Sequence, residues 1–314
     1  MGILSANEPF IISASVIILG YLLKRLDVLE ENDGEVLAKV ALNITLPSII
    51  LLNLPGVPIE SSNVLLPFFG LILPGFVVLL GLFFFRRLPR TDKGLSMMSS
   101  SGYNIGLFAI PMVMGLYGSA GIARFALFDI GNAFAIFGLS WYLAWYYSPI
   151  RKKGSISIRA VFRMFFGSIP FVAYILAVVM NLIGIRLEGT LMRFIEVPAA
   201  MNRGVSLLAL GILLRFKFPK GTWRAILPPL VLRYSFGIVA GALVLLLLPV
   251  SLENKITISA AMILPVGLAV IPFAVKWGYD RDSAAAILNV GIPVSFILFW
   301  LVWAAGNHLA ALNS

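Results

Sequence analysis

The fold is decided by the stretch Asn-Ile-Gly-Leu-Phe-Ala-Ile-Pro at residues 104–111. It lies inside an apolar segment, yet it contains an asparagine, a glycine and a proline. Glycine lowers helix stability, proline removes a backbone hydrogen-bond donor, and asparagine needs a polar partner in hydrocarbon. The stretch therefore predicts a helix that is interrupted inside a membrane.

The same pattern returns at residues 266–272, which read Val-Gly-Leu-Ala-Val-Ile-Pro, so that both copies contain Gly-Leu-x-x-Ile-Pro. Each copy is followed by a turn glycine, Gly118 or Gly278, and thirteen residues later by another glycine, Gly131 or Gly291. This shared spacing predicts two homologous halves, residues 1–150 and 151–314. Matching interrupted segments in two halves point to the binding site of a transporter.

The composition excludes an ordinary soluble protein. The chain has 314 residues, of which 60% are hydrophobic and only 12% charged, too few charges to cover a soluble surface of this size. The net charge is +10, but the basic residues lie in short loops beside apolar runs, where they set topology and do not indicate nucleic acid. Cysteine is absent from the sequence, so disulfides and thiolate metal sites are excluded. No metal or cofactor is predicted.

Ten apolar segments can be counted against the requirement of about 20 residues per span. They cover residues 9–23, 36–54, 64–85, 95–117, 122–147, 169–185, 194–214, 226–249, 256–277 and 284–305, and the fourth and ninth are interrupted. The fold class is therefore an all-α polytopic membrane protein with five spans in each half.

The distribution of basic residues predicts the orientation. Alternate loops, which include Lys152, Lys153, Lys217 and Lys220, hold 17 lysines and arginines, against three in the opposite loops. The positive-inside rule places the basic loops in the cytoplasm and both termini on the non-cytoplasmic side of the cell membrane. Because each half has an odd number of spans, the halves form an inverted-topology repeat.

Several stretches carry a resemblance to a known family. They are residues 18–25, Asn43 with Leu46-Pro47, 104–111, 128–132 (Phe-Asp-Ile-Gly-Asn) and 264–267 (Leu-Pro-Val-Gly). With these the chain resembles the auxin efflux carrier (PIN-like) family of membrane transporters, within the superfamily of bile acid and auxin transporters. The specific motifs are those in the fourth and fifth spans. Residues 202–206 depart from the family pattern, which often has a proline there.

The resemblance implies two inverted repeats of five helices in which the broken spans four and nine cross. It also implies an elevator-type motion of spans three to five and eight to ten against the others, a homodimer, and transport of organic anions such as auxin or malate. The long central loop of many plant members is missing, which favours a prokaryotic source.

The substrate site is expected at the crossing of the broken spans. Half-helix N-termini offer unpaired N–H groups and partial positive charge to an anion, and arginine can hold a carboxylate bidentately. Alternatively, Asn104 only caps its break, Asn132 only satisfies Asp129, and the proline and glycine only shape the second break. The expected substrate-binding residues are Asn104, Ile105, Gly106, Asn132, Arg233, Pro265, Val266 and Gly267.

Asp129 is the strongest candidate for ion coupling. A carboxylate deep in a span raises the free energy of the folded protein in the membrane, and such a residue usually marks an ion or proton path. Asn289 occupies the corresponding position of the second half, and Ser101 precedes the first break, where hydroxyl and carbonyl oxygens could coordinate sodium. The alternatives are a structural pair for Asp129 and small-residue packing for Ser101.

The leading function is a secondary transporter for a small organic anion, a carboxylate or auxin-like acid, coupled to H⁺ or Na⁺. The alternatives are an uncoupled facilitator and a sodium-coupled symporter of bile-acid type for an amphipathic anion. A channel would need a polar stripe that no span shows. An intramembrane enzyme is discounted, because the chain has one deep aspartate and a single histidine, His308.

Overall fold

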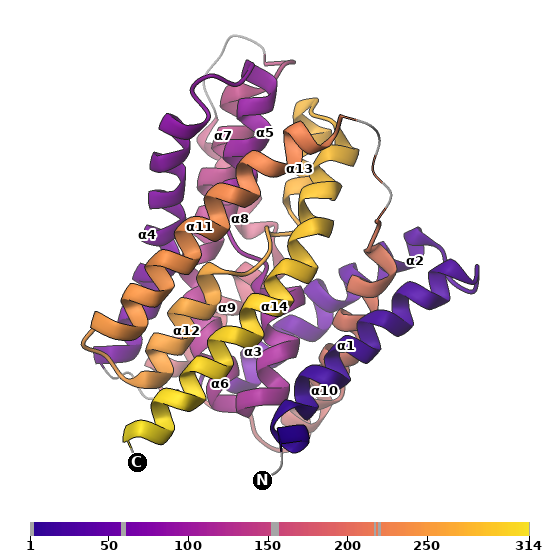
Figure 1. The fold of residues 1–314 in the computed structure, drawn as a ribbon. Helices are drawn as coiled ribbons and strands as arrows, with labels where there is room; N and C mark the ends of the chain where they lie inside the picture. The colour runs from indigo at the N-terminus through magenta and orange to yellow at the C-terminus, as the bar shows by residue number, and fades with distance from the viewer. Residues whose placement is uncertain (1–2, 58–60, 152–156, 217, 219–220, 314) are drawn as a thin grey trace. The chain divides into compact units, whose positions relative to one another are not determined.

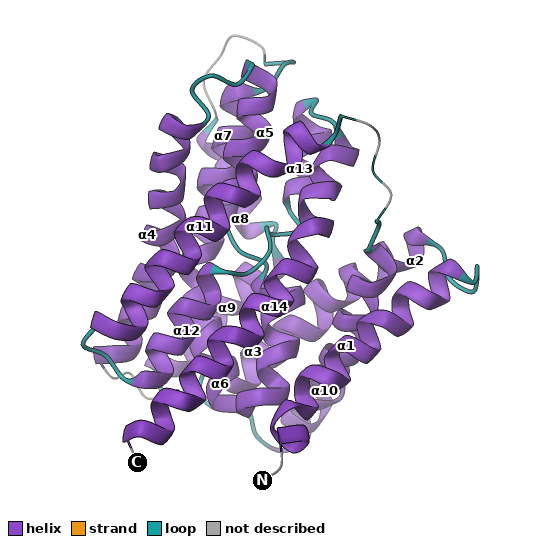
Figure 2. Ribbon diagram, in the orientation of Figure 1, coloured by secondary structure: helices purple, strands orange, loops and turns teal. Residues whose placement is uncertain are grey.

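The computed structural model describes residues 3–57, 61–151, 157–216, 218 and 221–313. All regular structure within these ranges is helical, with no strand among them (Figures 1 and 2). Four lysines of the predicted basic loops, Lys152, Lys153, Lys217 and Lys220, lie outside the described residues. The elements are α1 (Ile3–Arg25), α2 (Glu31–Val40), η1 (Ala41–Thr45), α3 (Leu46–Asn53), α4 (Ser61–Phe84), α5 (Arg90–Ser100), η2 (Ile105–Ala109), α6 (Ile110–Phe134), η3 (Ala135–Ser140), α7 (Trp141–Tyr147), α8 (Ile158–Phe166), α9 (Ile169–Leu182), α10 (Gly189–Leu213), α11 (Trp223–Leu247), α12 (Leu252–Met262), α13 (Val270–Trp277) and α14 (Arg281–Asn313).

The chain is a multi-pass helical membrane protein. Among the described residues, six helices are long and apolar enough to cross a bilayer, or seven if a bent pair counts as one span. The ten spans expected from the sequence stay a prediction. One reason for the difference is the second interruption: α12 has 11 residues and α13 has 8, so neither reaches the length of about 20 that a span needs.

Residues 105–147 form the longest apolar helical run, with 43 residues. A continuous α-helix of that length would measure roughly 65 Å, about twice the thickness of a hydrocarbon core. Gly118 divides the run, because its φ of 54° and ψ of −149° are not helical. A glycine tolerates this backbone conformation without steric cost, which explains why the turn glycine follows the motif.

The described chain divides into two compact units, each assembled from separate stretches of sequence. Unit 1 comprises Met1–Ile59, Ile105–Leu127 and Phe165–Leu214; unit 2 comprises Glu60–Asn104, Phe128–Met164 and Arg215–Ser314. The units interleave along the sequence, whereas the predicted halves 1–150 and 151–314 follow one another. Compactness and sequence repetition are different properties, so the repeat stays a prediction.

Unit 1 contains a close approach of α1 and α10. A Cβ atom added to Gly211 would lie 2.1 Å from the carbonyl oxygen of Ile17, and one added to Gly20 would lie 2.4 Å from that of Leu208. Small residues of this kind let membrane helices pack backbone against backbone. Asn181 joins α9 to the end of α3 in the same unit. Its amide donates to three carbonyl oxygens there and in the following turn, at 2.9–3.0 Å.

Unit 2 contains an equivalent approach between α4 and the later part of α6. A Cβ atom on Gly131 would lie 1.8 Å from the carbonyl oxygen of Pro67, and one on Gly70 would lie 2.0 Å from that of Phe128. Real Cβ atoms do not tolerate such distances, so both glycines are required. This packing fixes the helix that carries Asp129 and Asn132.

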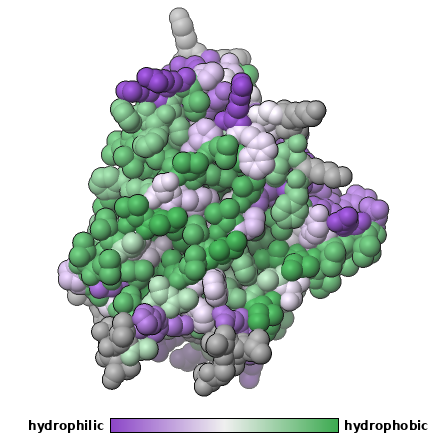
Figure 3. Space-filling model, viewed as in Figure 1, coloured by the Kyte–Doolittle hydropathy of each residue, from purple (hydrophilic) through white to green (hydrophobic). Residues whose placement is uncertain are grey.

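The outer surface of unit 2 suits a lipid environment. Figure 3 shows hydrophobic side chains over much of the visible face, where α11 and α14 run, with hydrophilic residues nearer the helix ends. Exposed large hydrophobic residues on α11 are Trp223, Leu227, Val231, Ile238, Val239, Leu243, Leu246 and Leu247. An apolar patch of this extent marks contact with lipid or with another protein.

Candidate functional site at two interrupted helices

The first interruption follows α5, which ends at Ser100. Residues 101–104 are not helical, and Gly102 has a φ of 81°, a conformation that glycine adopts readily. Helical structure resumes with the π-helical turn η2 at Ile105. The predicted break at Asn104 is therefore present, and it leaves the last carbonyl groups of α5 without partners inside the helix.

The second interruption lies between α12 and α13. Residues 263–269 connect them (Figure 2). Pro265 and Gly267 lie within this connection, as expected from the sequence. Val266 beside them is 1% exposed.

The two interruptions contact each other within unit 2. The backbone N–H of Asn104 donates to the carbonyl oxygen of Pro265 at 2.9 Å. Gly267 lies near residues 101–104 as well, since a Cβ atom on it would be 3.8 Å from the carbonyl oxygen of Tyr103. We call this place, formed by residues 101–104 and 263–269, the crossing. Ile105 and Gly106 are the first residues of unit 1 after it.

Asn132 fixes the backbone of the first interruption. Its amide oxygen accepts from the N–H of Tyr103 at 2.8 Å, and its Nδ2 donates to the carbonyl oxygen of Tyr103 at 2.9 Å. The same Nδ2 donates to Oδ1 of Asp129 at 2.7 Å. This contact with Asp129 is the one named as the alternative to substrate binding, and substrate binding by Asn132 stays a prediction. Asn132 also supplies Tyr103 with the two backbone hydrogen bonds that an uninterrupted helix would have provided.

Arg233 of α11 is 2% exposed, and its terminal nitrogens bind backbone carbonyls at the crossing. Nη1 donates to Ser100 and Gly102 at 2.9 Å each and to Ser99 at 3.3 Å, and Nη2 donates to Leu264 at 3.1 Å. The guanidinium therefore holds the chain at the end of α5 and just beyond α12. Substrate binding by Arg233 stays a prediction, and these contacts give its terminal nitrogens a structural role.

Tyr103 is a residue that the sequence reasoning did not single out. Its ring lies 4.9 Å from the guanidinium carbon of Arg233, a cation–π contact, and its buried hydroxyl has no hydrogen-bond partner in the described structure. Tyr234, next to Arg233, was also missed. Its hydroxyl donates to the carbonyl oxygen of Gly291 at 2.8 Å and lies 2.7 Å from Oγ of Ser295. The available signal was a pair of polar residues, Arg-Tyr, inside an apolar span.

The other predicted ion-coupling residues also lie in unit 2. Ser101 donates its hydroxyl to the carbonyl oxygen of Ala135 at 3.1 Å. Asn289 of α14 is 4% exposed, and its buried Oδ1 accepts no hydrogen bond in the described structure. A Cβ atom on Gly291, two residues further, would be 3.4 Å from that of Pro265. Within the described ranges, no three His, Cys, Asp or Glu side chains gather as a metal site would require.

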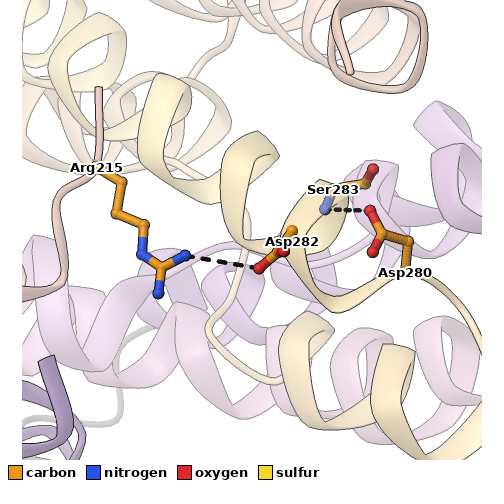
Figure 4. A network of polar contacts seen from close by, with 4 residues as sticks. All are labelled: Arg215, Asp280, Asp282 and Ser283. Carbon is orange, nitrogen blue, oxygen red and sulfur yellow. Dashed lines mark hydrogen bonds and ion pairs between the residues drawn. The ribbon is translucent and has the colours of Figure 1, made fainter. Parts of the chain in front are cut away.

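Charged residues gather around the start of α14 (Figure 4). Arg215 pairs with Asp282 at 3.6 Å, and both side chains are about half exposed, 40% and 55%, so the pair contributes only about 0–1 kcal/mol. Asp280 accepts from the backbone N–H of Ser283 at 2.8 Å and caps the helix. Hydrogen bonding from Ser283, through its side chain first and its backbone second, lowers the pKa of Asp280.

Comparison with known proteins finds no family model that matches the chain. The chain is 27% identical over 225 residues to an uncharacterized transporter of Methanothermobacter thermautotrophicus, which covers 68% of this chain and 70% of that protein. It is also 27% identical over 181 residues to an uncharacterized transporter of Methanocaldococcus jannaschii, which covers 55% of this chain and 56% of that protein. Both relatives are archaeal.

Proposed function

We propose that the chain is a secondary transporter for a small organic anion, a carboxylate or auxin-like acid, which binds at the crossing. The observation that carries this proposal is the hydrogen bond between Asn104 and Pro265, which joins two interrupted helices inside one unit. Interrupted apolar helices that meet are the usual site of substrate and coupling ions in transporters. The two archaeal relatives, both named transporters, support it.

An anion suits the charge at the crossing. All four acceptors of Arg233 are neutral backbone carbonyls, so no carboxylate of the described residues pairs with its charge. A fixed positive charge in a low-dielectric surrounding attracts an anion strongly. In this proposal the charge of Arg233 attracts the anion, while the side-chain amide of Asn104 and the backbone N–H groups of Val266 and Gly267 donate to the carboxylate. Asp129 carries a proton when the anion is bound, so that the two do not repel.

The transport cycle proposed is of the elevator type, on a ten-span fold with two inverted repeats. The compact units support it: unit 2 collects α4, α5, α7 and α11–α14, and unit 1 collects α1–α3, α9 and α10. This division matches the grouping of spans implied by the resemblance to auxin efflux carriers, except that residues 105–127 group with unit 1. The proposal includes a homodimer in a prokaryotic cell membrane, with both termini outside and no chemical step on the substrate.

Coupling is proposed to run through protons on Asp129. Asp129 accepts a hydrogen bond from Asn132, and Asn132 is hydrogen-bonded to the backbone of Tyr103. In this proposal, protonation of Asp129 changes the first of these hydrogen bonds and thereby the position of the backbone at the crossing. An uncoupled facilitator would show no dependence on a proton gradient. A sodium-coupled symporter of bile-acid type would require sodium in the external buffer.

Reconstituted protein tests the proposal. Purified protein in liposomes is challenged with radiolabelled monocarboxylates, dicarboxylates and indole-3-acetate, with and without a pH gradient and a sodium gradient. The proposal expects saturable uptake of at least one acid that a pH gradient accelerates. Uptake of a cation or a neutral solute, with none of any acid, would contradict it.

A further inference from the structure

Four backbone carbonyl oxygens converge on one buried cation at the crossing. They belong to Ser99, Ser100, Gly102 and Leu264, and lie 2.9–3.3 Å from the terminal nitrogens of Arg233. The oxygens come from two segments more than 160 residues apart in sequence, at the end of α5 and just beyond α12. The cation they surround is covalently attached to the protein.

Carbonyl oxygens freed at an interrupted helix are also suitable ligands for a metal cation. The C-terminal end of a helix carries partial negative charge, and unwound carbonyls in broken transporter helices coordinate sodium. Rings of carbonyl oxygens likewise replace the hydration shell of an ion in a channel filter. The group of carbonyls around Arg233 therefore has the chemistry of an alkali-cation site, and the guanidinium fills it.

We propose that Arg233 is a resident cation that occupies an alkali-metal site at the crossing and makes the protein independent of sodium there. It supplies the positive charge that a coupling ion would otherwise bring, and it holds the two interruptions together without an ion. The ring of Tyr103, 4.9 Å from the guanidinium carbon, covers it on one side. That substrate transport needs no sodium rests on the proposed function; occupation of the cation site does not.

The first test uses the wild-type protein in detergent without substrate. Its thermal unfolding is compared in sodium, lithium, potassium and N-methylglucamine chlorides at equal ionic strength. A resident guanidinium predicts the same unfolding temperature in all four. A specific rise in sodium or lithium would overturn the proposal, because it would show that an ion still binds.

The second test empties the site. Arg233→Ala leaves four buried carbonyls without donors, so its unfolding temperature is expected to fall by roughly 5 °C or more. Methylguanidinium at low millimolar concentration should restore part of this loss, and sodium should now stabilise the variant more than N-methylglucamine does. Arg233→Lys keeps a cation in place and should be more stable than Arg233→Ala and indifferent to methylguanidinium.

The matched control is Arg203→Ala in unit 1. Arg203 is a second arginine in a long helix, α10, but its Nη2 donates hydrogen bonds among the described residues only to the carbonyl oxygen of Pro9, at 3.1 Å, and to Oγ of Ser13, at 3.4 Å. This variant should show no recovery with methylguanidinium or sodium. Equal recovery in both variants, or none in an Arg233→Ala protein that folds, would overturn the proposal. If Arg233→Ala does not fold, the proposal is tested by the unfolding temperatures of the wild-type protein and of Arg233→Lys in the different cations.

These measurements separate two failures. A protein that moves no organic acid, yet shows the expected cation response in Arg233→Ala, refutes the proposed function and keeps the resident cation. A protein that moves an acid only in sodium, with sodium raising its unfolding temperature, refutes the resident cation and keeps the transporter.

Discussion

The backbone N–H of Asn104 donates a 2.9 Å hydrogen bond to the carbonyl oxygen of Pro265. Each of these residues lies two positions before the glycine of a Gly-Leu-x-x-Ile-Pro motif. The two interruptions therefore meet at matching positions of the two motifs. Because the contact uses backbone atoms, side chains at the crossing can be changed while the contact is kept.

Asn104→Ala tests substrate contact by the side chain. The substitution keeps the backbone N–H, and loss of a hydrogen bond to a charged group predicts a fall in apparent affinity of about tenfold to a hundredfold. The measurement is concentration-dependent uptake in liposomes. The control is Asn181→Ala, which removes three carbonyl contacts in unit 1 and should lower stability without changing apparent affinity. Unchanged affinity and rate in Asn104→Ala would remove the side chain from the site.

Asn132→Leu tests the support of the first interruption. It removes both hydrogen bonds to the backbone of Tyr103 and the one to Asp129, so we expect a loss of about 3 kcal/mol in unfolding free energy. Ser101→Ala, which removes one hydrogen bond to Ala135, should cost only about 1 kcal/mol. Unfolding in detergent measures both. Equal costs would argue that Asn132 does not organise the interruption.

Asp129→Asn tests proton coupling. An amide oxygen can still accept from Asn132 but cannot take up a proton, so uptake should lose its dependence on a pH gradient while the protein remains folded. Asn289→Asp is the matched change at the corresponding position of the second half, where the buried Oδ1 has no partner among the described residues; it should leave the pH dependence of uptake in place. Full gradient-driven uptake by Asp129→Asn would make Asp129 structural.

Gly131→Ala tests the close approach of α4 and α6. The added methyl group would lie 1.8 Å from the carbonyl oxygen of Pro67, so the helices must separate, at a cost of about 2 kcal/mol or more. Gly75→Ala is the control, because nothing lies within 4 Å of the added group, and alanine should stabilise the helix by about 0.5–1 kcal/mol. Similar unfolding temperatures for the two variants would contradict the packing.

Asp280 gives a pH-dependent prediction. Its folded pKa is lowered by hydrogen bonding from Ser283, so its contribution to stability is present above the ordinary aspartate value of 3.8 and is lost as the pH falls through the folded pKa. Asp280→Asn should keep the helix cap but lose the pH-dependent contribution to the free energy of unfolding. Asp280→Ala should lower the free energy of unfolding by about 1 kcal/mol at neutral pH. Identical acid profiles for wild type and Asp280→Asn would exclude the carboxylate as the source.

The sequence was sufficient to predict where the helices are interrupted. Glycine, proline and asparagine inside apolar runs have few uses other than a break, and both breaks are present. The spacing of Asp129 and Asn132, three residues apart on a helix, placed them on one face and allowed their contact as an alternative to substrate binding. The structure confirms these local features because each depends on residues close together in the chain.

The role of Arg233 could not be predicted in the same way. Three of its four acceptors lie 131 to 134 residues away in the sequence. All four are backbone carbonyls, and because every residue has one, the sequence does not indicate which of them accept. The count of ten spans stays a prediction for a related reason. The two parts of an interrupted helix are each too short to cross the bilayer, so the number of spans depends on which short helices together form one span.

The measurement that tests the central claim most directly is the current from protein-containing liposomes on a solid-supported membrane, for wild type and Asn104→Ala. Both are challenged with carboxylates at several pH values, in sodium and in N-methylglucamine. We predict a carboxylate-specific current in the wild type that depends on pH, does not depend on sodium, and is strongly reduced in Asn104→Ala. Equal currents in the two proteins, or no response to any carboxylate from folded wild-type protein, would contradict an anion site at the crossing.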